Sequence, residues 1–155
     1  MCNRRTNSRT LSALDGGNAP LAGIWIDRLV GVYDADHTLR GEVAYWVGAR
    51  LGRRHCSLCD ITHGTIREKS AWTACRNGLP VEFVTFHRDD QPDSIREVLA
   101  GQAPAVLAET DRGPLLLVGP AGLAACDGST DELVTAIEAS VKDLGLVWPA
   151  PKAVR

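Results

Sequence analysis

The sequence has no apolar run of about 18 residues, which is the length that a transmembrane helix needs. Positive charge is not in excess either, because 17 Lys and Arg face 19 Asp and Glu and give a net charge of -2. A chain that binds nucleic acid normally carries a basic surface. Residues 1–20 also lack the apolar segment of a secretory signal. We therefore expect a cytoplasmic protein with no membrane and no nucleic-acid partner.

The length and composition fit one globular domain. The chain has 155 residues, of which 45% are hydrophobic and 23% are charged. A chain of this size can bury a substantial core. The polar composition of residues 1–20 predicts a disordered or loosely held tail, so we expect residues 21–155 to form the domain.

The chain has five cysteines, namely Cys2, Cys56, Cys59, Cys75 and Cys126. An odd number without an export signal argues against a framework of structural disulfides. The segment RRHCSLCDITHG places two cysteines at CxxC spacing with two histidines close by. In a reducing cytoplasm, such a pair is more often a metal site or a redox site than a structural bridge.

Hydrophobic periodicity and turn residues predict the secondary structure. Thr65 with Glu68, and Ser129 with Glu132, have the spacing of helix capping boxes. In chain order, the expected elements are a strand over 29–33, helices over 39–51 and 65–77, a strand over 81–86, a helix over 92–101, a hairpin over 103–120 with TDRG as its turn, and a helix over 128–145.

This order resembles the thioredoxin-like superfamily, an α/β fold with a mixed four-stranded sheet flanked by helices. The second half is a hairpin followed by a helix, and Pro104 stands at the start of the third strand, where thioredoxin-like proteins carry a cis-proline beside their active site. The segment YDADHTLRGE, residues 33–42, also resembles small uncharacterised bacterial proteins of the same organisation.

The sequence departs from thioredoxin at the turn after the first strand. Thioredoxin has its redox CxxC there, whereas residues 34–39 contain no cysteine, which excludes ordinary thioredoxin chemistry at that position. The first βαβ crossover instead holds an extra helix and a CxxC connector over residues 52–64. If this connector climbs back to the carboxyl ends of the parallel strands, it brings Cys59 and His63 to the edge that carries His37 and His87.

The CxxC pair with His63 suits a metal ion. Cys56 and Cys59 offer two thiolates and His63 an imidazole, which is a ligand set for zinc and also for copper or iron. The candidates for a fourth ligand are His37, His55, Glu42 and His87. An open fourth position predicts a metalloenzyme with a small-molecule substrate, in which Cys56, Cys59, His37 and Glu42 are the catalytic candidates. A closed set predicts a non-catalytic binding module with a structural zinc.

The same two cysteines also suit thiol–disulfide exchange. Arg53, Arg54 and His55 directly precede Cys56, and positive charge favours the thiolate. In this interpretation the partner is a protein thiol. A third interpretation treats Cys56 and Cys59 as small buried hydrophobic residues in a loop.

Other candidates have simpler explanations. Asp34 and Asp36 suit acid–base chemistry, but a helix cap at Asp36 explains the pattern better. His87 lies in a polar strand-to-helix loop, and Cys75 and Cys126 are expected to be buried packing residues. The segment GPAGLAACDG lacks the lysine of a phosphate-binding loop, which argues against nucleotide binding there.

Overall fold

The computed structural model describes residues 23–34, 56–63 and 68–150. The helix expected over 39–51 and the expected tail over 1–20 lie outside these residues. The described elements are β1 (Ile24–Tyr33), α2 (Ser57–Thr62), α3 (Ser70–Asn77), β2 (Glu82–His87), α4 (Asp93–Leu99), β3 (Ala105–Thr110), β4 (Gly113–Val118), α5 (Pro120–Ala125), α6 (Thr130–Asp143) and β5 (Leu146–Val147).

The strands form one mixed sheet in the order β2-β1-β3-β4. Strand β1 runs parallel to β2 and antiparallel to β3, and β3 and β4 form an antiparallel hairpin. The short β5 pairs in parallel with the start of β1. The protein is therefore an α/β protein with a mixed sheet, and the parallel pairing of the first two strands agrees with the sequence prediction.

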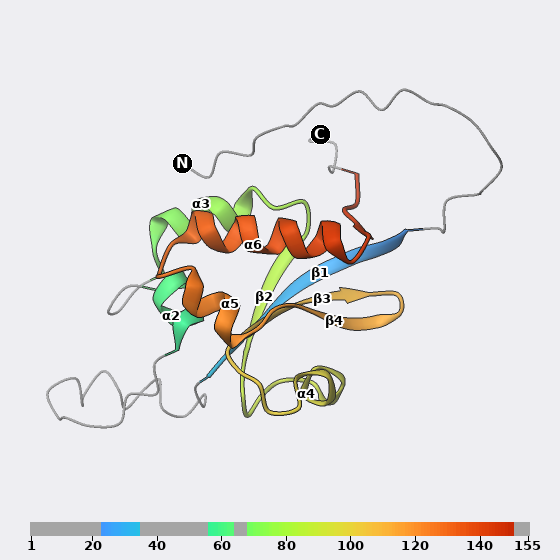
Figure 1. The fold of residues 1–155 in the computed structure, drawn as a ribbon, viewed down its shortest axis with the longest axis horizontal. Coiled ribbons are helices and arrows are strands. Elements are labelled where there is room, and N and C mark those ends of the chain that lie inside the picture. The colour runs from blue at the N-terminus through green and yellow to red at the C-terminus, as the bar shows by residue number, and fades with distance from the viewer. Residues whose placement is uncertain (1–22, 35–55, 64–67, 151–155) are drawn as a thin grey trace, which may run out of the picture.

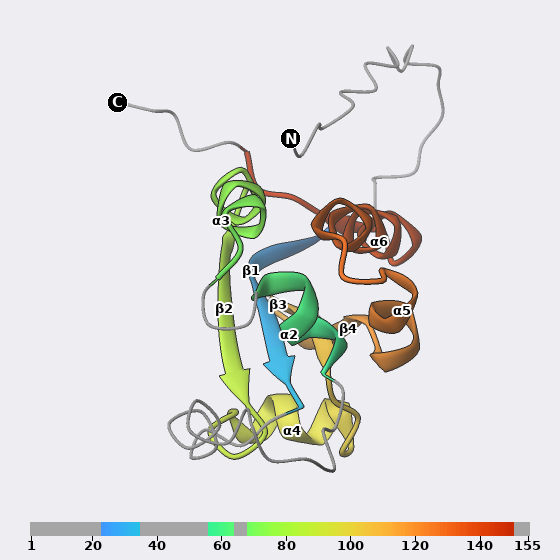
Figure 2. The ribbon, with the colours of Figure 1, turned by 90° about the vertical axis from the view of Figure 1, so that its left-hand side faces the viewer.

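Helices cover both faces of the sheet. Figure 1 shows α3 and α6 above the sheet and α4 below it, and Figure 2 shows α2 lying over β1 next to α5. The larger core lies on the face of α2, α3, α5 and α6 and includes Leu29, Leu58, Ile61, Trp72, Phe83, Leu123, Leu133 and Ile137. The smaller core lies under α4 and consists of Val30, Val32, Ile95, Leu99, Ala105 and Leu107.

Strand β1 is buried on both faces through its second half, Leu29 to Tyr33. Leu29 and Tyr33 belong to the larger core, whereas Val30 and Val32 belong to the smaller one, as the alternation of side chains along a strand requires. The register of β1 against β3 shifts between Ile26 and Arg28, and Ile26 also lies in the larger core. The strand ends with Tyr33 at the carboxyl edge of the sheet.

The hairpin and the last long helix were predicted correctly. Thr110 and Gly113 flank the turn, and the Thr110 hydroxyl donates a hydrogen bond to the Gly113 carbonyl over 2.8 Å. At α6, the Ser129 hydroxyl accepts the Glu132 N–H, as the capping box predicts. The Ala103–Pro104 peptide bond is cis, which is what the resemblance implies for this position.

Two predicted boundaries were wrong. Strand β1 begins at Ile24 rather than Leu29, because its first two residues pair with β5 from the far end of the chain. Helix α3 begins at Ser70, whereas Thr65 lies outside the described residues. Glu68 is not a helix-capping residue: it forms an isolated bridge with His63, and its carboxylate lies 3.0 Å from Arg76.

The connector expected over residues 52–64 contains a helix that was not predicted, because residues 57–62 form α2. Helix α5 and strand β5 were not predicted at all. The glycine-rich segment that contains α5 begins its helix with Pro120 at the first turn, a position that proline favours. In the described part of the chain, no helix combines the length and the apolar composition that a membrane span requires.

We predict that Gly31→Ala destabilises the protein by about 1–3 kcal/mol, the usual cost of overpacking a core. A Cβ atom at residue 31 would lie 2.9 Å from Cε1 of Phe83 and 3.2 Å from Cδ2 of Leu58, so β1 and α2 would have to separate. Urea denaturation measures the change. Gly78→Ala is the matched control, because its Cβ meets nothing closer than 3.4 Å. Equal effects of the two substitutions would contradict this account of the packing.

Candidate functional site

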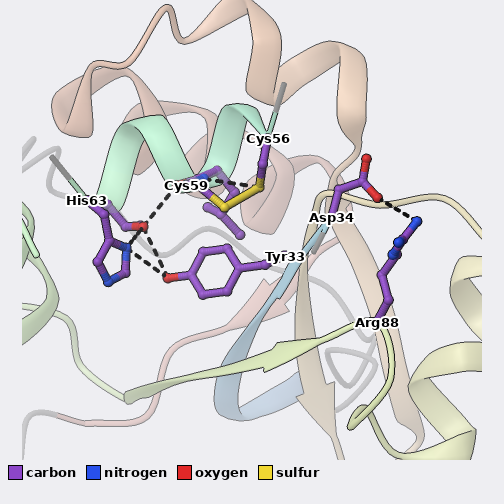
Figure 3. The surroundings of a disulfide bond; sticks show 8 residues. Tyr33, Asp34, Cys56, Cys59, His63 and Arg88 are labelled. Atoms are coloured by element: carbon purple, nitrogen blue, oxygen red, sulfur yellow. Dashed lines mark hydrogen bonds and ion pairs between the residues drawn. A yellow bond between two sulfur atoms is a disulfide. The ribbon is translucent and has the colours of Figure 1, made fainter. Parts of the chain in front are cut away.

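A disulfide between Cys56 and Cys59 lies at the start of α2, with the two Cα atoms 5.2 Å apart. Cys56 is the N-cap residue of this helix, and its sulfur accepts the backbone N–H of Cys59 over 3.3 Å. Figure 3 shows the disulfide above the ring of Tyr33, the last residue of β1. The CxxC pair therefore sits at the carboxyl edge of the sheet.

Local sequence explains why α2 forms here. Leu58 and Ile61 are three residues apart and fully buried in the larger core, so one face of a short helix packs against β1. A serine, threonine or aspartate oxygen usually caps the first turn of a helix. Here the Cys56 sulfur takes that position. The CxxC spacing thus places both sulfurs on the first turn, which is the geometry that lets them bond to each other.

Three polar side chains meet where α2 ends. The Thr62 hydroxyl lies 2.7 Å from Nδ1 of His63 and 3.1 Å from the hydroxyl of Tyr33, and the Tyr33 hydroxyl lies 3.5 Å from the same Nδ1 (Figure 3). Thr62 is fully buried and Tyr33 is 4% exposed. We call Tyr33, Thr62 and His63 the hydroxyl–imidazole cluster.

Hydrogen-bond counting assigns the protons in this cluster. A threonine hydroxyl has one proton and two acceptor lone pairs. The Thr62 proton is donated to the Leu58 carbonyl over 3.0 Å, so its oxygen is left to accept from Tyr33 O–H and from His63 Nδ1–H. In this arrangement, a neutral His63 that donates to Thr62 carries its ring proton on Nδ1.

His87 reaches the same tyrosine from the end of β2. Its ring centroid lies 5.5 Å from that of Tyr33, and the His63 centroid lies 5.8 Å from it in an edge-on arrangement. The Nδ1 atom of His87 lies 3.4 Å from a carboxylate oxygen of Asp90. His87 is 9% exposed and therefore buried. The sequence analysis had expected it in a solvated loop.

An ion pair lies at the same edge of the sheet. Asp34 follows β1 and Arg88 follows β2, and an oxygen of Asp34 lies 3.1 Å from Nη1 of Arg88 (Figure 3). Both side chains are partly exposed. The structure thus gives Asp34 a defined partner that joins the ends of two parallel strands.

Of the residues expected to meet at this edge of the sheet, His63 and His87 both contact Tyr33. Cys56 and Cys59 lie on α2, whose end brings His63 to Tyr33, and His87 contacts the same ring. The other candidates, His37, Glu42, His55 and Asp36, lie outside the described residues. Tyr33 and Thr62 were not proposed from the sequence. A tyrosine at the end of an otherwise apolar strand was the signal that could have found Tyr33.

The predicted metal site stays a prediction. Within the described ranges 23–34, 56–63 and 68–150, no three or more His, Cys, Asp or Glu side chains are grouped so that they could hold a metal ion. The sulfurs of Cys56 and Cys59 are bonded to each other, and a metal ligand must be a thiolate. A zinc, copper or iron ion could use them only after reduction.

The remaining described cysteines are buried, as the sequence analysis expected. Cys75 is 4% exposed and packs in the same core as Trp72, but it is disulfide-bonded, which the sequence analysis did not expect. Cys126 is also 4% exposed, and its thiol donates a hydrogen bond to the Gly122 carbonyl over 3.3 Å. Burial, with a smaller contribution from the negative charge of Glu132, raises the pKa of the Cys126 thiol. This thiol therefore stays protonated and unreactive at neutral pH.

Comparison of the chain with protein-family models, with curated proteins and with solved structures gave no match.

We predict that Thr62→Val destabilises the protein by about 1–3 kcal/mol, because it leaves the buried hydroxyl of Tyr33 and Nδ1 of His63 without their shared partner. Tyr33→Phe removes one hydroxyl and should cost less. Thermal or urea unfolding measures both. The control is Thr135→Val, since Thr135 makes the same type of bond to the carbonyl four residues earlier on the exposed side of α6. A Thr62 variant no less stable than the Thr135 variant would refute the cluster's role.

Proposed function

We propose that this protein is a thiol–disulfide oxidoreductase of thioredoxin-like architecture, with Cys56 and Cys59 as its redox pair. The observation that carries the proposal is the Cys56–Cys59 disulfide itself, which places both sulfurs on one helical turn at the carboxyl edge of the sheet. This edge is where open α/β sheets hold their ligands.

The sheet supports the thioredoxin-like assignment. Two parallel strands, β1 and β2, are followed by an antiparallel hairpin, and the strand order is β2-β1-β3-β4. In thioredoxin the redox cysteines follow the first strand directly. Here residues 34–55 separate β1 from the cysteines, yet Thr62 at the end of α2 and His63 directly after it contact Tyr33 at the end of β1. The motif is displaced in sequence and remains beside that strand in space.

The proposed reaction moves two electrons between two dithiol couples. A partner dithiol opens the Cys56–Cys59 disulfide through a mixed disulfide. The partner's second thiolate then attacks its own sulfur in that mixed disulfide, so a partner disulfide forms and the second cysteine of the pair is released. The two protons of the partner's thiols pass to Cys56 and Cys59. The reverse sequence oxidises a substrate dithiol.

The backbone favours one thiolate of the pair. The Cys59 N–H points at the Cys56 sulfur over 3.3 Å, and a hydrogen bond to a thiolate is stronger than one to a neutral thiol. This contact lowers the free energy of a Cys56 thiolate relative to its thiol, which is the usual requirement of a redox cysteine.

We predict that the Cys56–Cys59 pair titrates reversibly in dithiothreitol redox buffers as a single two-electron couple. The slope should be about 30 mV for each tenfold change in the ratio of the two forms. Alkylation followed by mass spectrometry of the peptide with residues 55–67 measures that ratio. Cys126→Ser is the control and should titrate unchanged, because that thiol is buried and donates its proton to the Gly122 carbonyl. A pair that stays reduced in oxidising buffer would refute the proposal.

A metal-binding function is the second candidate, because His63 and His87 both reach Tyr33 beside the cysteines. We predict that elemental analysis distinguishes the redox function from the metal-binding function. The redox proposal expects the fully reduced protein to bind less than one zinc per chain after incubation and buffer exchange. The control is the double variant Cys56→Ser, Cys59→Ser. About one zinc, copper or iron per wild-type chain, lost in the double variant, would instead establish the metal site and displace the redox proposal.

A further inference from the structure

The two cysteines of the disulfide differ in how exposed they are. Cys56 is 8% exposed and belongs to the larger core, together with Tyr33 and Leu58. Cys59 is partly exposed and packs against that core from its edge. The two cysteines are neighbours on one helical turn, so this difference decides from which side a partner reaches the bond.

We infer that Cys59 is the sulfur that exchanges with the partner, and that Cys56 is the buried leaving group. This assignment rests on the proposed function. An attacking thiolate approaches a disulfide in line with the S–S bond, from the side opposite the departing sulfur. Cys59 is the more exposed of the two residues, whereas Cys56 belongs to the larger core, so we expect a partner thiolate to reach Cys59 more readily.

The hydrogen bond inside the motif supports the same assignment. When a partner thiolate bonds to the Cys59 sulfur, the Cys56–Cys59 bond breaks and its electron pair stays on the Cys56 sulfur. That sulfur already accepts the Cys59 N–H over 3.3 Å, so the developing charge is stabilised where it forms. A thiol of lower pKa leaves a disulfide faster. Accessibility and leaving-group stability therefore select the same sulfur.

When a partner dithiol reduces the protein, the exchange takes two steps. The partner thiolate forms a bond to Cys59, and Cys56 leaves as a thiolate and takes the proton of the partner thiol. A second partner thiolate then attacks the partner sulfur of the mixed disulfide, forms the partner disulfide and releases the Cys59 thiolate, which takes the second proton. Two partner thiols are oxidised and one protein disulfide is reduced.

The test traps the mixed disulfide in the wild-type chain. The oxidised protein is mixed with glutathione, the reaction is stopped with acid after short times, and free thiols are alkylated. Trypsin releases residues 55–67 as one peptide, and fragmentation between Ser57 and Leu58 assigns the glutathione to one cysteine. We expect the adduct on Cys59 to exceed that on Cys56 by about tenfold or more. An adduct mainly on Cys56, or divided equally, overturns the assignment and leaves the proposed function intact. A disulfide that never yields an adduct overturns both.

A second measurement separates accessibility from ionisation. Cys56→Ser keeps Cys59 and retains a side-chain oxygen that can cap α2, whereas Cys59→Ser keeps Cys56 and the same backbone donor. Both reduced variants are treated with glutathione disulfide at about pH 9.5, about one unit above the ordinary pKa of cysteine. We expect the Cys56→Ser variant to be modified about tenfold faster. Equal rates, or a faster Cys59→Ser variant, would contradict the assignment.

Discussion

The backbone pairing of β1 is the interaction on which the rest of the structure depends. This strand is hydrogen-bonded to β2 on one side and β3 on the other, and its first residues also pair with β5. Both of its faces are covered, one by the larger core and one by the smaller core under α4. A strand held in this way has a fixed register, because a slip of one residue would exchange the two sets of side chains. Tyr33 at the end of β1 therefore has a fixed position. Side chains from the end of α2 and the end of β2 contact it.

The sequence predicted those parts of the fold that depend on local pattern. The apolar run before Tyr33, the hairpin turn and the Ser129 cap each need only neighbouring residues, and each was found where expected. The start of β1 was missed because it depends on pairing with β5, which lies more than a hundred residues further along the chain. Helix α2 was missed because six residues are too few to display a helical period and because a cysteine is an unusual cap.

Some features of the candidate site could likewise be predicted from the sequence, and others could not. The position of His87 beside Tyr33 was predictable, because the carboxyl ends of parallel strands lie at one edge of a sheet. His63 was expected at this edge only if the connector returned to it. The cluster of Tyr33, Thr62 and His63 was not, since it depends on how a helix of one and a half turns is rotated over β1. Nor could spacing choose between metal and redox chemistry, because a CxxC pair with a nearby imidazole serves both. The choice depends on whether the two sulfurs bond to an ion or to each other, which the spacing of the residues does not determine.

Because the Cys56 sulfur is both a member of the disulfide and the cap of α2, the oxidation state of the pair is thermodynamically linked to the stability of that helix. A thiolate is a stronger acceptor for the Cys59 N–H than a disulfide sulfur is, so whatever free energy the cap gains on reduction is also free energy that favours the reduced pair. The reverse holds with equal magnitude: any change that removes this hydrogen bond from the reduced pair removes the same free energy from its stability. If the pair has the proposed redox role, the six-residue helix α2 links the conformation of the sheet edge to the redox equilibrium of its two cysteines.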